Sequence, residues 1–283
     1  MLQTLNNVSL LIVTWDGDTL LKNCLKSILD VYTTLPETVV VDNASLESTK
    51  NLVESFPNTT YLPLSENKGF AGGNNAGLKF CTKDYILLLN NDTIAHSDFI
   101  SPLVKFLQEH ERVGIVQGTM NIPALNNGLD DCGVLMTPFG IQRHLNRGKP
   151  TATTILKPRK VFSVKGAMMM FKRAVLQDVG FLFYDHFWSY YEETDFCHRA
   201  KNAGWEAYFV PTPPIDHLCG ATSTRFDNKT IWRRYFRNII YSFWKNYGLF
   251  GRTFTLPIFI CAAFIRSPSA LCAAMKDIIE MRF

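Results

Sequence analysis

The first half of the chain alternates short apolar runs with segments of helical spacing. Four runs rich in Val, Ile, Leu and Tyr end in polar or turn residues, as buried strands do: residues 8–14, 38–42, 59–64 and 85–90. Between the first two, residues 18–30 repeat Leu and Ile three and four positions apart, which predicts an amphipathic helix. Residues 45–55 and 74–83 show weaker helical patterns. Strands that alternate with helices are typical of a parallel sheet with right-handed crossovers.

The second half of the chain is less regular. Residues 114–120 and 205–211 have the composition of strands, whereas residues 121–160 are rich in Asn, Gly and Pro and are expected to form loops. Residues 161–176 predict a strand followed by a short helix, and a further helix is expected to begin in the acidic segment after residue 190. We expect all of these to complete one Rossmann-like α/β fold, in which a mixed, mostly parallel sheet is flanked by helices.

The tail of the chain differs from the body in charge and composition. From Arg225 to Phe283 it carries ten Lys and Arg against three acids, interleaved with Trp, Tyr and Phe. Two helices are predicted, at residues 229–247 and 253–265, and the apolar run of the second has 13 residues, whereas a bilayer requires about 20. We therefore expect residues 1–228 to form the main domain and residues 229–283 a helical extension. Binding to an anionic membrane surface is slightly favoured over packing on the body.

Composition restricts the class of protein. Of the 283 residues, 47% are hydrophobic and 19% are charged, which excludes a disordered or fibrous chain. The seven cysteines are scattered without a C-x-x-C pair, and no secretory signal is visible. Both observations predict a cytoplasmic protein with reduced thiols, peripheral on the inner face of the plasma membrane if the tail binds lipid. A nucleic-acid partner is not expected, because the positive charge lies within the apolar tail.

Three of the predicted strands end in polar side chains. They are Thr14, Trp15 and Asp16 at the end of the first strand, Asp42 and Asn43 at the end of the second, and Asn90, Asn91 and Asp92 at the end of the fourth. Ligands bind at the carboxyl ends of strands in parallel sheets, so these residues predict a ligand site. Asp42 could accept hydrogen bonds from a base or ribose, and Asp92 could hold a hard divalent cation beside a diphosphate. Helix capping after Asp42 and an ordinary turn at Asp92 are the alternatives.

Two further segments carry candidate chemistry. Residues 67–77 (NKGFAGGNNAG) combine four Gly and three Asn in what we expect to be a ligand-facing loop, although they match neither the P-loop nor the dinucleotide fingerprint. Residues 190–205 place Glu192, Glu193 and Asp195 at the start of a helix, where Glu192 and Asp195 should share one face and Glu193 should point elsewhere. Crowded acids can raise a carboxyl pKa and create a general base, whereas ordinary helix-start chemistry is the alternative.

Taken in order, six segments resemble one family: VSLLIVTWDG, VVVDNAS, NKGFAGGNNAG, YILLLNNDT, KGAMMMFKRAVLQDVGF, and YYEETDFCHRAKNAGW followed by DH. They are similar to the inverting family 2 glycosyltransferases of the GT-A fold, in particular to the bacterial rhamnosyltransferase-like branch. The resemblance runs from about residue 8 to residue 225 and implies a GT-A fold for that part of the chain. Trp15-Asp16 stands where the family commonly has Tyr-Asn, and Asn90 stands at the first position of the D-x-D motif.

The resemblance implies a role for individual residues. Glu193 takes the position of the catalytic base. The residues that would contact the nucleotide are Thr14, Trp15, Asp42, Asn43, Gly69, Gly73, Asn74 and Asn91. Asp92 and His217 would hold a divalent cation, Mg²⁺ or Mn²⁺, on the diphosphate, and Trp188 and Asp195 would lie near the acceptor.

The activity that the resemblance implies is inverting hexosyl transfer in cell-surface polysaccharide synthesis. The donor would be a dTDP-, UDP- or GDP-linked sugar, with rhamnose as one candidate, and the acceptor a hydroxyl of a saccharide or of a lipid-linked acceptor. A nucleotidyltransferase is an alternative, but the first basic residue is Lys22, so no glycine-rich, basic N-terminal loop is present to hold a triphosphate. A non-catalytic module that binds sugar or membrane is the other alternative, and it would need neither Asp92 nor Glu193.

Overall fold

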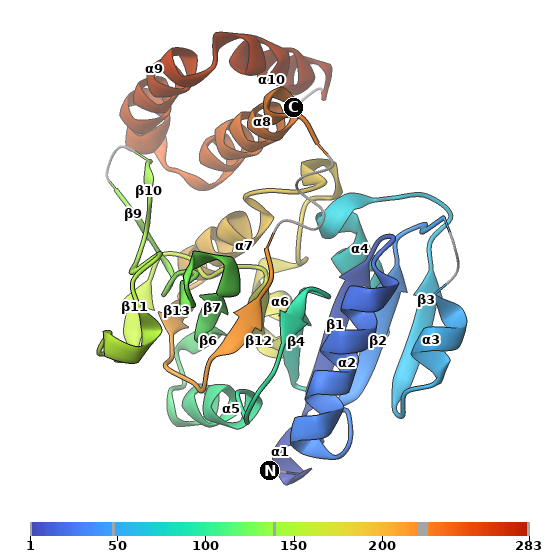
Figure 1. Ribbon diagram of the computed structural model, residues 1–283. Helices are drawn as coiled ribbons and strands as arrows, with labels where there is room; N and C mark the ends of the chain where they lie inside the picture. Colours follow the sequence, from blue (N-terminus) through green and yellow to red (C-terminus); the bar gives the residue numbers. More distant parts are fainter. Residues whose placement is uncertain (1, 47–48, 138–139, 220–225, 282–283) are drawn as a thin grey trace.

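The computed structural model describes residues 2–46, 49–137, 140–219 and 226–281. Its centre is an eight-stranded sheet in the order β11-β13-β6-β12-β4-β1-β2-β3 (Figure 1). The strands are β1 (Val8–Thr14), β2 (Glu37–Asp42), β3 (Thr59–Pro63), β4 (Tyr85–Leu89), β6 (Val113–Gln117), β11 (Arg159–Val161), β12 (Met168–Lys172) and β13 (Glu206–Phe209). Strands β4, β1, β2 and β3 run parallel, as do β6 and β13, whereas β12 and β11 are antiparallel to their neighbours. The predicted mixed, mostly parallel sheet is confirmed.

Helices cover both faces of this sheet. One face carries α2 (Asp18–Tyr32) and α5 (Ile100–Glu109), and the other carries α4 (Gly69–Leu78), α6 (Arg173–Val179) and α7 (Glu192–Asn202). Successive residues of β1 belong to different layers, because Leu10 and Ile12 pack with α2 and Leu11 packs on the α4 side. Burial of the central strands on both faces explains why their sequences are continuous apolar runs.

Most elements predicted in the first half are present. The four strands and the helix at residues 18–30 are confirmed by β1 to β4 and α2. The helix predicted at residues 45–55 is shorter and spans only α3 (Lys50–Glu54). The prediction of a loop over residues 67–77 is wrong, because helix α4 begins at Gly69 and includes most of that segment.

The glycines of α4 allow this helix to lie close to the sheet. A Cβ atom at Gly77 would lie 2.4 Å from Leu11 Cδ1, and one at Gly73 would lie 2.8 Å from Val13 Cγ1. Both distances are shorter than carbon atoms of packed side chains allow, so the two positions require glycine. A segment with the composition of a flexible loop is therefore a buried helix.

Residues 121–160, expected to form loops, contribute to two small sheets. The first contains β5 (Thr93–Ile94), β14 (Ile215–His217), β7 (Met120–Ile122) and β8 (Gly128–Leu129), and the second pairs β9 (Val134–Met136) with β10 (Gln142–His144). Within the first sheet His217 is paired with Thr93. This pairing brings His217 beside the residues that follow β4, although the two segments are far apart in the sequence.

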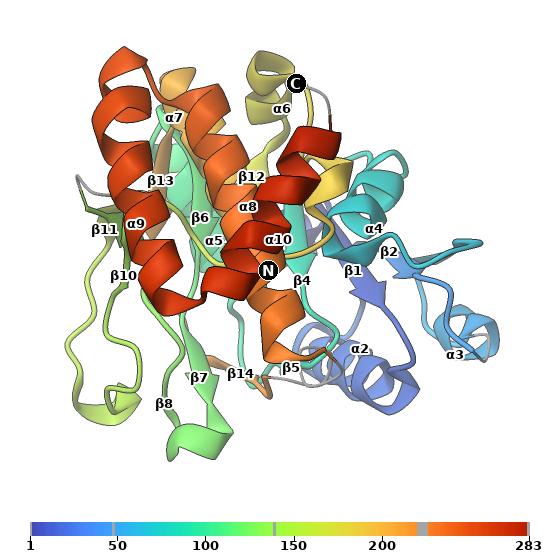
Figure 2. The same ribbon diagram turned by 90° about the horizontal axis from the view of Figure 1, so that it is seen from above.

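The described tail contains α8 (Asn228–Asn246), α9 (Leu256–Arg266) and α10 (Pro268–Glu280), with a π-helical turn (Gly251–Thr255) before α9. The first two helices were predicted and α10 was not. The tail lies above the edge of the sheet at which β1 and β4 end (Figures 1 and 2) and has its own apolar cluster, which also includes Tyr191 of the body. None of the helices described is both long and apolar enough to cross a bilayer. The domain boundary at residue 228 stays a prediction.

Candidate active site

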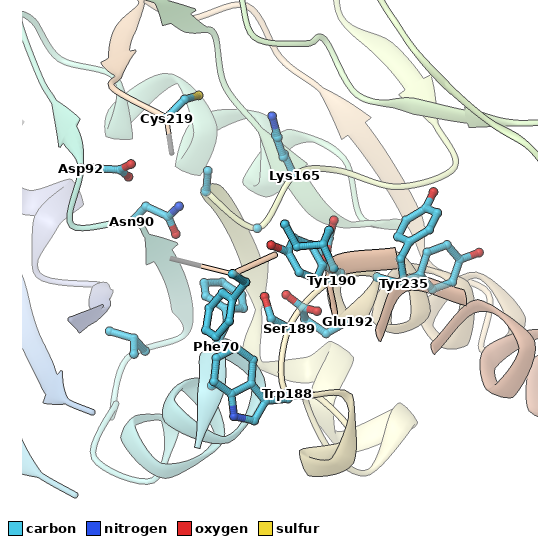
Figure 3. Close-up of a pocket in the computed structure, with 18 of the residues that line it drawn as sticks. Phe70, Asn90, Asp92, Lys165, Trp188, Ser189, Tyr190, Glu192, Cys219 and Tyr235 are labelled. Atoms are coloured by element: carbon cyan, nitrogen blue, oxygen red, sulfur yellow. The ribbon is translucent and has the colours of Figure 1, made fainter. Parts of the chain in front are cut away.

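A cavity of about 680 Å³ lies where β1 and β4 end, between the sheet and the tail (Figure 3). Residues far apart in sequence meet in its wall, from Thr14 at the end of β1 to Tyr235 of α8. The predicted site residues that line it are Thr14, Trp15, Asn43, Gly69, Asn91, Asp92, Trp188, Glu193 and His217. The polar residues at the strand ends therefore lie at the edge of the sheet where this cavity is found.

Asp42 is not in the wall of this cavity. Its carboxylate accepts hydrogen bonds from Ser45 N (2.9 Å), Thr49 Oγ1 (3.1 Å) and Tyr61 OH (2.8 Å). Burial opposes the charge, but these hydrogen bonds hold the pKa of Asp42 below its ordinary value. Asp42 therefore closes the turn after β2, and its position does not support the expected contact with a nucleotide.

Two residues of α4 also lie outside the wall, contrary to expectation. Gly73 faces Val13 in the layer between helix and sheet. Asn74 is buried, and its Nδ2 donates to Phe70 O at 2.8 Å. Because the segment forms a helix rather than a loop, only its first turn reaches the cavity.

The acidic start of α7 is arranged differently from the prediction. Asp195 is 1% exposed, and its carboxylate accepts from Arg199 Nε at 2.8 Å and from Asn246 Nδ2 at 2.6 Å. It therefore joins α7 to the tail, and its expected place beside an acceptor is not supported. Glu192 and Glu193 both line the cavity, since the open first turn of α7 faces it. The expectation that Glu193 points away from Glu192 is wrong.

Asn43 joins the end of β2 to the start of α4. Its Nδ2 donates to Asn67 Oδ1 and to Gly69 O, both at 3.0 Å, and its Oδ1 accepts from Lys68 N at 2.9 Å. Gly69 has a φ angle of 68°, and a Cβ atom there would lie 2.2 Å from Trp188 O. A glycine at this position is what allows Trp188 to form part of the cavity wall.

Asp92 and His217 meet at one end of the cavity. Asp92 Oδ1 is buried, accepts no hydrogen bond from any residue in the described ranges, and lies 3.4 Å from His217 Nε2. The other ring nitrogen of His217, Nδ1, lies 2.8 Å from Asp130 Oδ2. Burial alone would lower the pKa of His217, but the carboxylates of Asp130 and Asp92 raise that pKa to about 11.

This pair fits a divalent cation. Carboxylate oxygen and imidazole nitrogen are ordinary ligands, and a ligating histidine usually donates its other N–H to a carboxylate, as His217 can donate to Asp130. Asp130, His217 and Cys219 also form a group whose ligand atoms lie within 4.8 Å of one another. The carboxylate of Asp130 is already bonded to Lys165 and His217, however. Asp92 and His217 Nε2 are therefore the better ligands.

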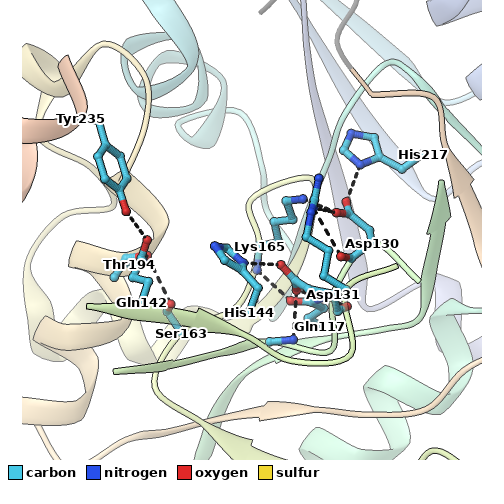
Figure 4. Close-up of polar contacts among 12 residues, drawn as sticks. Gln117, Asp130, Asp131, Gln142, His144, Ser163, Lys165, Thr194, His217 and Tyr235 are labelled. Atoms are coloured by element: carbon cyan, nitrogen blue, oxygen red, sulfur yellow. Dashed lines mark hydrogen bonds and ion pairs between the residues drawn. The ribbon is translucent and has the colours of Figure 1, made fainter. Parts of the chain in front are cut away.

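Two buried acids that the sequence analysis missed hold basic side chains in the cavity wall (Figure 4). Asp130 forms ion pairs with Lys165 and Arg147, and Asp131 Oδ2 lies 2.9 Å from His144 Nδ1. Burial opposes the charge of both acids, but their hydrogen bonds and the nearby cations keep their pKa values low. The signal in the sequence was the adjacent Asp pair, which provides the only acids between Glu111 and Asp178.

The Glu192 and Glu193 carboxyls have unusual acidities. Burial raises the pKa of Glu193 to about 7, against the smaller opposing effects of its own backbone N–H and of Lys165. Burial and the adjacent Glu193 raise the pKa of Glu192 well above its ordinary value. At neutral pH Glu193 is therefore close to the midpoint of its titration. A carboxyl that titrates near pH 7 is suited to act as a general base.

Aromatic side chains close the cavity on the side of the tail. Trp15 stacks on Phe226 with ring centroids 6.3 Å apart, and Trp188 meets Phe226 edge-on at 5.2 Å. Tyr235 donates a hydrogen bond of 2.7 Å to Gln142 Oε1. Flat apolar rings with a few fixed polar groups are typical of sites for small organic ligands.

Comparison with known proteins gives a consistent result. Residues 9–180 match the family described as Glycosyl transferase family 2. The low-salt glycan biosynthesis hexosyltransferase Agl10 of Haloferax volcanii is 29% identical over 231 residues, which cover 79% of this chain and 71% of the relative. A poly-beta-1,6-N-acetyl-D-glucosamine synthase of Staphylococcus epidermidis is 22% identical over 184 residues, covering 63% of this chain and only 42% of the relative.

Solved structures share the fold at low sequence identity. The mannosyltransferase PcManGT from Pyrobaculum calidifontis, in complex with GDP-Man and Mn²⁺, matches with a TM-score of 0.58 at 17% identity, covering 95% of this chain and 73% of that one. TarS of S. aureus matches with a TM-score of 0.60 at 17% identity, covering 85% of this chain and 40% of that one. GalNAc-T7 with UDP, GalNAc and Mn²⁺ has a TM-score of 0.61 at 12% identity, with 81% and 48% covered. The expected GT-A fold is confirmed.

Proposed function

Because the chain belongs to glycosyl transferase family 2, we propose that it transfers a hexose, with inversion, from a nucleotide-diphosphate sugar to a hydroxyl of a saccharide or lipid-linked acceptor. The relatives are a glycan biosynthesis hexosyltransferase and a polysaccharide synthase, which supports a role in cell-surface polysaccharide synthesis. The observation that carries the mechanism is Glu193, a carboxyl with a pKa of about 7 in the same cavity as Asp92 and His217.

Glu193 is the proposed catalytic base. Its ionised carboxylate accepts the proton of the acceptor hydroxyl while the hydroxyl oxygen forms a bond to the anomeric carbon of the donor. The bond between that carbon and the diphosphate oxygen breaks, and its electron pair leaves with the nucleoside diphosphate. A single displacement of this kind inverts the anomeric configuration. General-base assistance contributes typically ~10²–10⁴-fold to the rate.

The opposite end of the cavity suits the diphosphate. Asp92 and His217 are the residues that would hold Mg²⁺ or Mn²⁺, and the bound cation supplies positive charge that stabilises the leaving group. Because His217 is protonated without a cation, binding of the cation would release that proton. Lys165 and Arg147, both held by Asp130, add positive charge to the same wall. Two structural neighbours contain Mn²⁺ together with UDP or GDP-Man, which supports use of a divalent cation.

The nucleoside is proposed to lie against the ends of β1 and β2. Asn91 Nδ2 donates to Thr14 Oγ1 at 2.9 Å, which ties the ends of β1 and β4 together beneath this part of the cavity. Trp15 offers a ring for stacking on a base, and Asn43 borders the same region. The proposed donors are dTDP-, UDP- and GDP-linked sugars, with rhamnose as a candidate on the resemblance alone. Trp188 is the proposed acceptor contact.

Titration calorimetry with dTDP, UDP, GDP and CMP, each with and without Mn²⁺, tests donor binding. We expect metal-dependent binding of one nucleotide, its loss in Asp92→Ala, and no change in Asp30→Ala, which removes an exposed acid of α2. Binding that is independent of Mn²⁺ would remove the role of Asp92. Binding of a nucleotide sugar without any turnover would favour the non-catalytic module. Consumption of a sugar 1-phosphate with a nucleoside triphosphate would favour a nucleotidyltransferase.

The tail is proposed to attach the enzyme to an anionic membrane surface, on the cytoplasmic side, where a lipid-linked acceptor would be found. Large apolar side chains are exposed between Leu249 (79% exposed) and Ile265 (84%). They are Leu249, Phe250, Phe254, Ile258, Phe264 and Ile265. Arg252 and Arg266 lie in the same stretch, and residues 248–276 contain no acid. Exposed apolar side chains together with positive charge suit the interface of an anionic membrane.

Sedimentation with vesicles tests this attachment. We expect binding to vesicles that contain anionic lipid, weakening as salt is raised, and little binding to neutral vesicles. The double variant Phe250→Ser, Ile265→Ser should lose binding, whereas Phe80→Ser, which changes an exposed aromatic of the body, should retain it. Absence of binding at low salt would contradict the proposal, and gel filtration would then show whether the apolar face joins two copies of the chain.

A further inference from the structure

A second cavity, of about 500 Å³, lies between the tail and the turn that precedes α7. One of its walls is a single face of α8, because Thr230, Arg233, Arg234 and Arg237 follow one another at helical spacing. Helix α10 and the short 3-10 turn η3 (Asp185–Phe187) provide the other walls. The transfer proposed above uses none of these arginines.

Within the described ranges, only Arg233 of these three arginines has a carboxylate partner. Arg233 forms a two-bond ion pair with Asp277 of α10. Arg237 donates from Nε to Asn238 Oδ1 at 2.9 Å and from Nη2 to Phe187 O at 2.8 Å, and both acceptors are uncharged. Its Nη1 group therefore keeps its donors available for a ligand.

The remaining acids at this cavity, Glu280 and Asp185, interact with residues other than Arg234 and Arg237. Glu280 Oε1 lies 3.8 Å from Lys276 Nζ, and Asp185 Oδ1 accepts from Asn75 Nδ2 at 2.7 Å. Neither acid is paired with Arg234 or Arg237 in the described structure. The wall therefore holds three arginines and three acids, and two of the arginines, Arg234 and Arg237, have no carboxylate partner in the described structure.

Aromatic rings hold Arg234 in place. Its guanidinium carbon lies 3.7 Å from the ring centroid of Trp188 and 4.6 Å from that of Phe226, which fixes the plane of the group. Its Nη1 is buried and makes no hydrogen bond with any residue that the structure describes, and the same holds for Nε2 of His186 in the cavity wall. A buried polar nitrogen without a partner is costly, so two of them beside one cavity indicate a ligand that carries acceptor oxygens.

We propose that this arginine cavity, defined by Arg234, Arg237 and His186, binds a phosphate or diphosphate group. A guanidinium donates two parallel hydrogen bonds to an oxyanion, and two arginines on one helix face can bond different oxygens of one phosphate. A carboxylate has two oxygens and one charge, which would leave the second arginine unpaired. The volume of about 500 Å³ accommodates a diphosphate.

The position of Trp188 indicates the source of this phosphate. Trp188 lines both the arginine cavity and the active-site cavity, where Figure 3 shows it beside Ser189 and Phe70. A ligand on each side of this indole ring would place a phosphate close to the reacting hydroxyl. The phosphate is therefore assigned to the acceptor. This assignment rests on the proposed function, whereas the binding of phosphate does not.

The first experiment measures phosphate binding without divalent cations. The active-site cavity then lacks the cation proposed to hold a diphosphate there, so the measurement reports on the arginine cavity. Phosphate and pyrophosphate are titrated by calorimetry at constant ionic strength into the wild type and three variants. We expect Arg234→Gln to weaken binding roughly tenfold or more, because a charge-assisted pair is lost. Arg234→Lys keeps the charge but not the paired donors, so its loss should be smaller. Arg112→Gln, at an exposed arginine between α5 and β6, is the matched control and should bind as the wild type does.

Vesicles distinguish a lipid-borne phosphate from a free one. Phosphatidylcholine vesicles are prepared with phosphatidic acid, which has a phosphomonoester, or with phosphatidylglycerol, which has only a diester, at matched surface charge. A preference for phosphatidic acid that is lost in Arg234→Gln and kept in Arg112→Gln assigns the cavity to a lipid headgroup. Binding of phosphate or pyrophosphate without such a preference assigns it to a phosphate outside the membrane.

Two results would overturn the proposal. One is a folded wild type that binds neither phosphate nor pyrophosphate, and the other is equal binding by Arg234→Gln and the wild type. Circular dichroism and thermal unfolding test whether each variant is folded. If Arg234→Gln does not fold, Arg234→Lys is compared with the wild type in its place. Neither experiment measures sugar transfer, so failure of phosphate binding and failure of the proposed function are separate results.

Discussion

The partly buried carboxyl of Glu193 connects activity and stability through one pKa. Burial raises that pKa to about 7 from an ordinary value of 4.5. The change that tests this connection is Glu193→Gln, which keeps the size of the side chain and removes its ionisation. We expect the variant to lose turnover by ~10²–10⁴-fold and to be more stable than the wild type at pH 8.

The size of the stability change follows from the two pKa values. Between pH 4.5 and about 7 the unfolded chain has released the Glu193 proton while the folded protein retains it, so the free energy of unfolding falls as pH rises. The stabilisation of the folded protein that comes from the raised pKa of Glu193 is complete below pH 4.5 and is lost as pH rises through about 7. At ~1.4 kcal/mol per pKa unit, the shift from 4.5 to about 7 corresponds to about 3 kcal/mol. Glutamine does not ionise, so the variant does not lose this stabilisation as pH rises. The free energy of unfolding of the variant should therefore exceed that of the wild type by a small amount near pH 5 and by about 3 kcal/mol at pH 8.

Two measurements over the same pH range check this reasoning. Urea denaturation gives the free energy of unfolding of both proteins, and kcat/KM for sugar transfer gives the activity of the wild type. In the wild type kcat/KM should rise tenfold per pH unit at acidic pH and become level above about pH 7. Glu193→Asp keeps the carboxylate and should retain a pH-dependent rate. Glu54→Gln removes an exposed acid of α3 and should change neither quantity.

Three outcomes would refute parts of this argument. A stability difference that is constant with pH would contradict a buried carboxyl with a raised pKa. An acidic limb of kcat/KM near pH 4.5 would show that the base is not shifted, even if Glu193 is essential. Turnover close to that of the wild type in Glu193→Gln would remove Glu193 from the mechanism.

Three further predictions concern the surroundings of the base. Asp92→Asn should abolish Mn²⁺-dependent nucleotide binding in calorimetry with less than ~1 kcal/mol change in stability, and retained binding would exclude Asp92 as a ligand. Gly69→Ala should lower the free energy of unfolding by ~1–3 kcal/mol in urea denaturation, because its φ angle is 68° and the added Cβ would meet Trp188 O at 2.2 Å; an unchanged midpoint would contradict this. Asn238→Ala should cost ~1–3 kcal/mol, because its Nδ2 donates to carbonyl oxygens within residues 187–190, and the loss should be accompanied by faster hydrogen exchange in that turn.

The fold and one edge of the site could be predicted because their signals are local. Each central strand is buried on both faces, so its sequence is one continuous apolar run. The polar residues at its end mark the edge of the sheet where ligands bind. The basic wall could not be predicted in the same way. Asp130 and Asp131 follow β8, and His144 ends β10. These strands have only two or three residues and pair in short hairpins with β7 and β9. Pairing of this kind leaves little periodicity in residues 121–160, so the segment has the composition of a loop.

Individual acids show a second limit of the sequence. Asp42 ends the buried strand β2 and Asp92 follows the buried strand β4. The carboxylate of Asp42 accepts hydrogen bonds from Ser45, Thr49 and Tyr61, whereas Asp92 Oδ1 faces His217. Both acids belong to the polar residues at the carboxyl end of a strand, so the local pattern does not separate their roles. The difference arises from neighbours in other elements, which supply hydrogen-bond donors in one case and a second candidate ligand in the other.

The tail forms part of the active-site wall as well as the surface proposed to meet a membrane. Charge and apolar content separate it from the body near residue 228, but Trp232 and Tyr235 line the active-site cavity. An adjacent face of α8 places Arg234 in the wall of the arginine cavity. Apolar side chains of α9, such as Ile265, are exposed. One helix therefore borders both cavities while its neighbour α9 offers the apolar surface. Contact of the tail with lipid would for this reason act directly on the wall of the site, and removing residues 229–283 would remove wall and anchor together.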